Sequence, residues 1–166
     1  MLHRIGLGLG IFALAAATSL RAQGPTVTLQ PTQGNNVKGS ISLMTMGNGV
    51  HFTGTVTGLT AGKHGFHVHE NGDCSAPDGA SAGGHFNPDK KAHGASDAAE
   101  HHAGDLGNIE ADASGAAKVS IHMNGLTLGP GANSVMGKAI IVHANPDDFS
   151  QPTGNAGARL ACGVIK

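Results

Sequence analysis

The stretch VKGSISLMTMGNGVHFTGTVT, residues 37–57, decides the fold class. Apolar and polar residues alternate over 37–46 and again over 51–57, which is the period of a strand with one buried face. Asn48-Gly49 between the two segments is a strong signal for a tight hairpin, because both residue types tolerate positive φ. The stretch therefore predicts two antiparallel strands joined by a short turn.

Similar strand-like segments lie on both sides of this hairpin. Twenty-seven glycines and the absence of Trp and Tyr favour many turns over long helices. The periodic segments are residues 26–30, 63–70, 108–111, 117–123, 138–143 and 160–165. With the hairpin they make about eight strands, joined by connections of unequal length. We therefore expect an all-β fold, an eight-stranded Greek-key β-barrel or sandwich of immunoglobulin-like architecture.

One connection stands out because residues 71–107 lose all periodicity. This region is filled with Gly, Ala, Ser, Asp and His, and it contains one cysteine. A structureless loop of that length inside a compact domain is usually functional or disordered. The histidines in it favour a function.

The N-terminal residues predict a secretory signal. Residues 3–4, His-Arg, precede an apolar run over 5–17 that is too short to span a bilayer, and small residues follow it. Cleavage after Ala22 or after Ala17 is compatible with the pattern, and an uncleaved membrane anchor is the alternative. We expect a cleaved signal peptide over residues 1–22 and an exported domain over 23–166, in the periplasm or outside the cell.

Charge and cysteine content fit an exported protein. Removal of residues 1–22 takes two arginines, which leaves eight Lys and Arg against eleven Asp and Glu. No basic run or aromatic platform predicts nucleic-acid binding, and we expect no membrane contact after signal removal. Only Cys74 and Cys162 are present. Export favours a disulfide between them; two free thiols or a cysteine metal site are the alternatives.

Six of the eleven histidines form the pattern that points to chemistry. His67 and His69 lie two residues apart on one predicted strand, so their side chains point the same way and can share one ion. Further candidate ligands follow along the chain: His85, His93, His102, Asp105 and His143. Together they supply more nitrogen than one metal ion needs.

Four motifs carry a resemblance to a known family. In chain order they are GFHVHE (65–70), GHFNP (84–88), HAGDLGN (102–108) and GNAGARLACGVI (154–165). They resemble the copper/zinc superoxide dismutases, in particular the exported bacterial type. The likeness extends from about Thr26 to the end of the chain.

The resemblance implies one copper and one zinc ion per subunit. Copper, which imidazole binds well in both oxidation states, would take four histidines: His67, His69, His85 and His143. Zinc prefers four tetrahedral nitrogen and oxygen ligands and would take His85, His93, His102 and Asp105. His85 is in both sets, so its ring would be deprotonated and would bridge the two metals.

The resemblance also implies a reaction, the dismutation of superoxide. One superoxide would reduce Cu(II) and leave as dioxygen, and a second would reoxidise Cu(I) and leave as hydrogen peroxide. His85 and Arg159 are the implied catalytic residues: His85 would carry a proton, and Arg159 would attract and orient the small anion. Thr153 would narrow the substrate channel. A homodimer is expected from the resemblance alone.

The resemblance assigns a supporting carboxylate to Asp147, which would link His67 to His93, because a metal-bound imidazole usually has its other nitrogen held by an acceptor. Asp148 is the alternative, as a solvated neighbour. Residues 147–153 are short and carry no run of charges.

The other histidines receive ordinary roles. We expect His64, on the strand face opposite His67, to hydrogen-bond backbone in or near the core. His101 competes with His102 for the zinc register, and the HAGD motif favours His102. His51 and His122 alternate with apolar neighbours and should face solvent.

Met44 and Met46 carry thioethers that copper can use, but on an alternating strand we expect them in the core. Two rival functions stand beside the enzyme. A metal-delivery domain of the same fold is the main one, and a purely structural sandwich is a weaker one. Loss of His85 or Arg159 would favour the metal-delivery domain, and the sequence keeps both residues.

Overall fold

The computed structural model describes residues 24–166, so the predicted signal peptide over residues 1–22 lies outside the described residues. Eight strands and one short 3-10 helix form the described part. They are β1 (Thr26–Pro31), β2 (Lys38–Met46), β3 (Gly49–Thr57), β4 (Gly62–His69), η1 (Ala80–Ala82), β5 (Asp105–Ala111), β6 (Ala117–Asn124), β7 (Ala139–His143) and β8 (Arg159–Val164).

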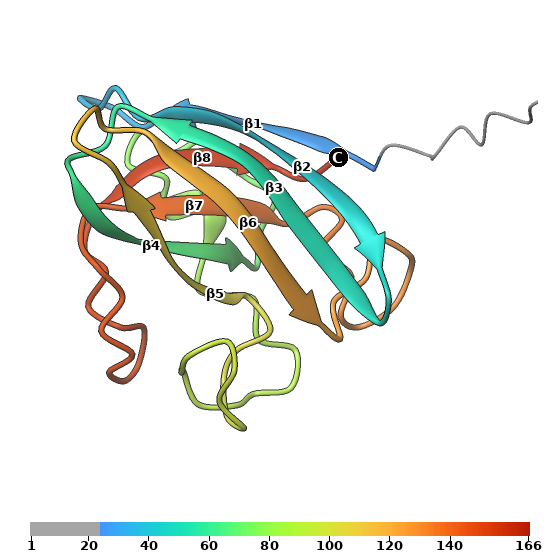
Figure 1. Cartoon of the computed structure of the whole chain (residues 1–166). Helices are drawn as coiled ribbons and strands as arrows, with labels where there is room; N and C mark the ends of the chain where they lie inside the picture. Colours follow the sequence, from blue (N-terminus) through green and yellow to red (C-terminus); the bar gives the residue numbers. More distant parts are fainter. Residues whose placement is uncertain (1–23) are drawn as a thin grey trace, which may run out of the picture.

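The strands close into an antiparallel barrel in the order β1-β2-β3-β6-β5-β4-β7-β8 (Figure 1). The neighbours β3 and β6, and β4 and β7, are distant in sequence, which makes the connections Greek-key crossovers. The all-β, eight-stranded prediction is confirmed, and closure leaves no unpaired edge strand among the described strands. In the described part of the chain no helix is long and apolar enough to cross a membrane.

The β2–β3 hairpin forms as expected, with its turn one residue earlier than the Asn48-Gly49 signal suggests. Met46 pairs with Gly49, so Gly47 and Asn48 are the two turn residues. Gly47 has φ 57°, which suits the first position of a type II′ turn and which a residue with a Cβ adopts at a cost. Gly49 is instead the first residue of β3.

The buried hydrophobic core consists of aliphatic side chains with Met123 and three phenylalanines, Phe52, Phe66 and Phe86. On β2, Ile41 and Leu43 point inward and are 0% and 1% exposed. The prediction that Met44 and Met46 lie in the core is wrong, because they have the opposite strand parity and are 36% and 44% exposed. Hydrophobicity suggested the core, whereas the register places both thioethers on the outer face.

Two long connections cover part of the outer wall, residues 70–104 before β5 and residues 144–158 before β8; Figure 1 shows both extending from the same side of the barrel. The aperiodic region expected over 71–107 is a connection of this kind with the short helix η1 inside it, and it ends three residues earlier because β5 begins at Asp105. Val68 accepts a hydrogen bond from the Phe86 backbone N–H at 2.8 Å, and its own N–H donates to Gly104 at 2.9 Å. The loop therefore continues the sheet beyond the point where β4 leaves β5.

Candidate metal centre

Strand parity places the first two histidines. Phe66 and Val68 point into the barrel core, so His67 and His69 point to the outer face beneath the long loops. Both are buried, at 0% and 1% exposed, although they lie outside the barrel. His143 ends the neighbouring strand β7, and its ring centroid lies 5.5 Å from that of His69.

Two groups of ligand atoms form on this wall. In each group the side chains offer one ligand atom apiece, and these atoms all lie within 4.8 Å of one another. The first group is His67, His69, His85 and His143, and the second is His85, His93, His102 and Asp105. All seven candidate ligands named from the sequence therefore come together, and His85 belongs to both groups.

Asp105 is the centre of the second group. Its Oδ1 lies 2.8 Å from His85 Nδ1 and 3.2 Å from His102 Nδ1, and its Oδ2 lies 2.9 Å from His93 Nδ1. Oδ2 also accepts the backbone N–H of His102 at 2.7 Å. Three imidazoles thus face one carboxylate, the nitrogen and oxygen set that zinc prefers.

The ring nitrogens of the first group fit a bound cation. His69 Nδ1 donates to the Gly83 carbonyl at 2.9 Å, and His143 Nδ1 donates to the Gly157 carbonyl at 3.2 Å. A carbonyl only accepts, so the protons lie on the Nδ1 atoms. The two Nε2 lone pairs then face each other at 3.3 Å, an arrangement that a cation between them would stabilise.

Within these two ligand groups, two buried nitrogens make no hydrogen bond, His67 Nδ1 in the first group and His93 Nδ1 in the second. His93 Nδ1 is close to Asp105 Oδ2, but as a salt-bridge contact without the alignment of a hydrogen bond. A buried polar atom left unsatisfied costs about 1–3 kcal/mol, so such atoms call for an explanation. A metal ion in each group would satisfy both of them. This observation and the facing lone pairs show that the residues fit copper and zinc.

Asp147 holds the opposite sides of the same two rings. Its Oδ2 lies 2.8 Å from His67 Nε2 and its Oδ1 lies 2.9 Å from His93 Nε2, and the residue is 3% exposed. Asp148 instead faces solvent and accepts hydrogen bonds from Ser150. Asp147 therefore links the two groups. It holds the second nitrogen of a ring in each, and such an acceptor usually fixes the orientation of a metal-binding imidazole.

Two anchors of this linkage are not among the residues predicted from the sequence. Asn108 Oδ1 accepts the Asp147 N–H at 2.7 Å, and Asn108 Nδ2 donates to the Asp147 carbonyl at 2.9 Å. Gln151 makes the same double contact with the backbone of His93, at 3.1 and 2.8 Å. Asn108 ends the HAGDLGN motif, which was the available signal, whereas Gln151 had none.

Burial sets the protonation states of the ligands. Desolvation lowers the pKa of His69 to about 2 and that of His143 to about 3, and it also lowers the pKa of His67 and His102. Burial alone would raise the pKa of Asp105, but its hydrogen bonds with His85 and His102 lower it to about 2. At neutral pH these groups are neutral imidazoles and an ionised carboxylate, the forms that bind metals.

A pocket of about 150 Å³ opens onto the first group and gives it access to solvent. His69, His85, His143, Thr153 and Arg159 line it. Arg159 donates from Nη1 to the Gly79 carbonyl at 2.7 Å and from Nη2 to the Gly83 carbonyl at 2.6 Å. The guanidinium is thereby fixed in the pocket wall, and no carboxylate neutralises it through an ion pair among the described residues.

A disulfide joins Cys74 to Cys162, with Cα atoms 5.8 Å apart, and so ties the loop before η1 to β8. The connection that carries Cys74 also supplies the carbonyls that hold Arg159 and His69, from Gly79 before η1 and Gly83 after it. The other histidines of residues 24–166 lie outside both groups. His64 donates from Nδ1 to the His143 carbonyl at 2.8 Å, and His101 Nδ1 donates to the His102 carbonyl at 2.8 Å.

Comparison with known proteins identifies the family. The sequence model of copper/zinc superoxide dismutase (SODC) matches residues 37–165. Superoxide dismutase [Cu-Zn] 2 of Mesembryanthemum crystallinum is 49% identical over 140 residues, which cover 79% of this chain and 88% of the relative. Extracellular superoxide dismutase [Cu-Zn] of Caenorhabditis elegans is 46% identical over 135 residues, 76% of this chain and 60% of the relative. The chain therefore belongs to the copper/zinc superoxide dismutase family.

Proposed function

We propose that the two ligand groups are the catalytic centre of a superoxide dismutase, with copper bound by His67, His69, His85 and His143 and zinc bound by His85, His93, His102 and Asp105. The reaction is the conversion of superoxide to dioxygen and hydrogen peroxide, with one copper and one zinc ion per subunit. The observation that carries the assignment is the membership of His85 in both groups. A protein that bound two unrelated ions would not need a shared ring.

Bound copper supplies the alternating one-electron oxidation and reduction on which the dismutation depends. Arg159 receives the substrate, because a fixed guanidinium beside His69 and His143 attracts and orients a small anion. Thr153, on the same pocket wall, limits the size of what enters. The anion thus reaches the first ligand group in a defined orientation.

His85 has the position for proton transfer. Its Nδ1 faces Asp105 at 2.8 Å, which leaves Nε2, on the other side of the ring, for the first group and the pocket that His85 lines. Nε2 can hold a proton while Nδ1 stays on the zinc side, and can then donate it to the reduced substrate. Asp147 keeps the rings of His67 and His93 from turning meanwhile.

Metal content and superoxide decay test this function. Purified protein, prepared without added metal, should contain one copper and one zinc per chain and should accelerate superoxide decay in pulse radiolysis. A fully metallated protein that leaves the decay rate unchanged would refute the enzyme and favour a metal carrier.

Sharing of His85 is tested separately. His85→Ala should lose zinc as well as activity after dialysis, because one ring serves both groups, whereas His101→Gln, outside both groups, should keep both metals. Wild-type zinc retention in His85→Ala would contradict the shared ring.

We further propose that residues 1–22 are a cleaved signal peptide and that residues 23–166 act outside the cytoplasm in antioxidant defence, as a homodimer. The extracellular relative supports export. Whether the location is periplasmic or extracellular, and whether the enzyme is of the bacterial type, stay predictions. Mass spectrometry of the exported chain should give a new N-terminus at Gln23, and sedimentation velocity should give the dimer mass. An intact N-terminus or a monomer would contradict the respective proposal.

A further inference from the structure

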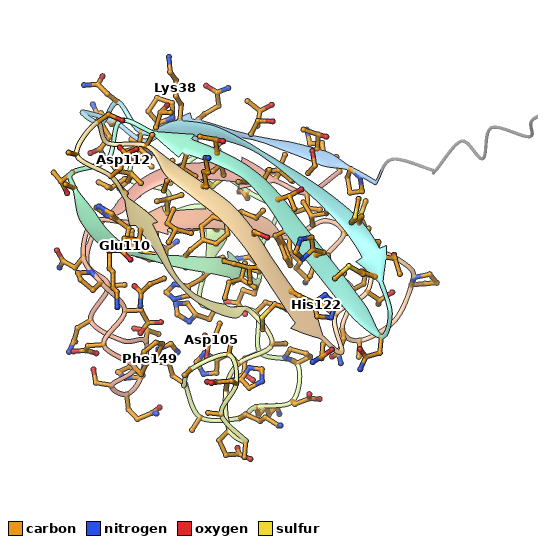
Figure 2. All side chains as sticks on the ribbon, viewed as in Figure 1. Lys38, Asp105, Glu110, Asp112, His122 and Phe149 are labelled. Carbon is orange, nitrogen blue, oxygen red and sulfur yellow. A yellow bond between two sulfur atoms is a disulfide. The ribbon has the colours of Figure 1, made fainter. Side chains whose placement is uncertain are left out.

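A second cluster of nitrogen and sulfur donors lies on the outer face of the barrel, away from the catalytic wall. Met44 on β2 pairs with His51 on β3, and His51 pairs with His122 on β6. Met44 follows buried Leu43, His51 lies between buried Val50 and Phe52, and His122 precedes buried Met123, so the three side chains point outward in one row across three strands. Figure 2 shows His122 near the end of β6, well apart from Asp105.

The spacing of the two imidazoles suits one ion. The ring centroids of His51 and His122 lie 6.2 Å apart, with 35° between the ring planes. A metal–nitrogen bond of about 2 Å puts a ring centroid about 3.2 Å from the ion, so two rings on one ion have centroids at most about 6.4 Å apart, and a separation near that limit corresponds to two nitrogens on nearly opposite sides of the ion. In the catalytic copper group the corresponding distances run from 4.1 to 6.4 Å. The outer pair falls within that range.

Unpartnered nitrogens single out the same two residues. In the described part of the chain, four imidazole nitrogens are buried without a hydrogen-bond partner, and all four are Nδ1 atoms. His67 and His93 account for two of them, and each belongs to a catalytic ligand group. His51 and His122 account for the other two, without any such assignment.

The opposite nitrogens of this pair already have neighbours. His122 Nε2 lies 3.1 Å from Asn124 Oδ1, and His51 Nε2 lies 3.5 Å from Ser120 Oγ. A polar group that holds one nitrogen of a ring while the other nitrogen is unpartnered is the pattern seen around metal-binding histidines. The same pattern occurs in the catalytic centre, where Asp147 holds Nε2 of His67.

The third side chain of the row indicates which metal. Met44 is 36% exposed and carries a flexible thioether; its position lies directly across from His51, one strand spacing from it and two from His122. Two imidazoles suit copper, and a thioether is a soft ligand that selects copper(I); the set brings no negative charge and so favours a soft monovalent ion over a hard divalent one. We propose that Met44, His51 and His122 form a surface site for one copper(I) ion, separate from the catalytic centre.

Competition titration tests the site on the copper- and zinc-loaded protein. The probe is copper(I) itself, kept reduced by ascorbate without oxygen and shared with a chromophoric copper(I) chelator. The wild type should bind one equivalent more than the catalytic centre holds. His51→Gln and His122→Gln should each weaken this binding at least tenfold, whereas Thr53→Ala, on the same outer face, should bind like the wild type. Met44→Leu should weaken binding several-fold, and Met46→Leu should not.

The outcomes separate the parts of the proposal. No additional equivalent in the wild type, or wild-type affinity in both histidine variants, overturns the site. Equal copper(I) affinity in Met44→Leu and Met46→Leu overturns the thioether ligand and the preference for copper(I). Superoxide decay by the loaded variants should equal that of the wild type, which shows that the barrel is intact and makes failure of this site distinguishable from failure of the catalytic centre.

Discussion

A single methyl group at Gly154 should uncouple the two metal sites without changing any ligand. Gly154 has φ +71°, and a Cβ built on it would overlap Asp147 Oδ1 and lie 2.6 Å from Asp147 Cγ and 2.7 Å from His93 Nε2. Neither neighbour can yield freely, because the carboxylate is held by the two histidine rings and by the Phe149 N–H at 2.8 Å. In Gly154→Ala the carboxylate must therefore move off His67 and His93.

The size of the effect follows from the hydrogen bonds that this movement breaks. A hydrogen bond to a charged group contributes about 1.5–3 kcal/mol, so breaking both bonds between Asp147 and the histidines should lower the free energy of unfolding by at least about 3 kcal/mol. A residue with a Cβ at positive φ costs about 1–2 kcal/mol more. Removal of such a partner weakens metal binding about 10–100-fold. Because Asp147 holds a ring of each group, copper and zinc should be affected alike.

The matched control is Gly125→Ala. Gly125 has φ +79° and nothing within 4 Å of its built Cβ, so this variant carries the backbone strain alone. Chelator competition for each metal and urea unfolding of the metal-free proteins should separate the two variants. If Gly154→Ala binds both metals as tightly as Gly125→Ala, the assignment of Asp147 as the link between the sites is refuted.

The pocket, the disulfide and the buried rings each give a further prediction. Arg159→Ala should slow superoxide decay roughly tenfold in pulse radiolysis, since a unit charge about 5 Å from the anion contributes about 1–3 kcal/mol. Arg159→Lys should keep most of the rate. An unchanged rate in the alanine variant would contradict the role of Arg159 in attracting the anion. Replacement of Cys74 and Cys162 by alanine should lower the free energy of unfolding, measured in urea, by about 4–5 kcal/mol, because the disulfide closes a loop with a sequence separation of 88 residues. A loss under about 1 kcal/mol would refute this stabilisation by loop closure. In the metal-free protein, the free energy of unfolding should be highest above pH 6.5 and should fall by up to about 1.4 kcal/mol per pH unit for each of His69 and His143 as the pH falls toward 3. The reason is that the unfolded chain takes up protons there, whereas the folded rings, with pKa values of about 2 and 3, do not. Unfolding that does not depend on pH would contradict the buried neutral rings.

The strands and the ligand set were accessible from the sequence because both depend on short patterns. Alternation in residues 37–57 predicted the first hairpin, and the two-residue spacing of His67 and His69 predicted a shared strand face. The wrong prediction for Met44 came from its hydrophobicity, which favours the core. Strand alternation places Met44 on the outer face, because the preceding residue, Leu43, points into the core. The hairpin turn lies one residue earlier because Gly47 was available to adopt positive φ.

The support of the site was not accessible, because it consists of contacts between residues far apart in the chain. No sequence pattern marks Gly79, whose carbonyl accepts a hydrogen bond from Arg159, or Gln151, whose amide holds the backbone of His93. Their role depends on how two loops pack on the barrel wall, and no local periodicity encodes that packing. The motifs predicted which side chains act, whereas only the fold showed what holds them.

The position of the ligand groups on the outside of the barrel separates assembly from activation. The interior is filled by side chains such as Phe52, Phe66 and Ile140, all 0% exposed, whereas strand parity turns His67 and His69 to the outer face. The barrel can therefore reach its final shape before either ion arrives. Metal loading then acts on a finished scaffold, and the loops over the wall can be remodelled by mutation, to alter metal choice or access, without repacking the interior.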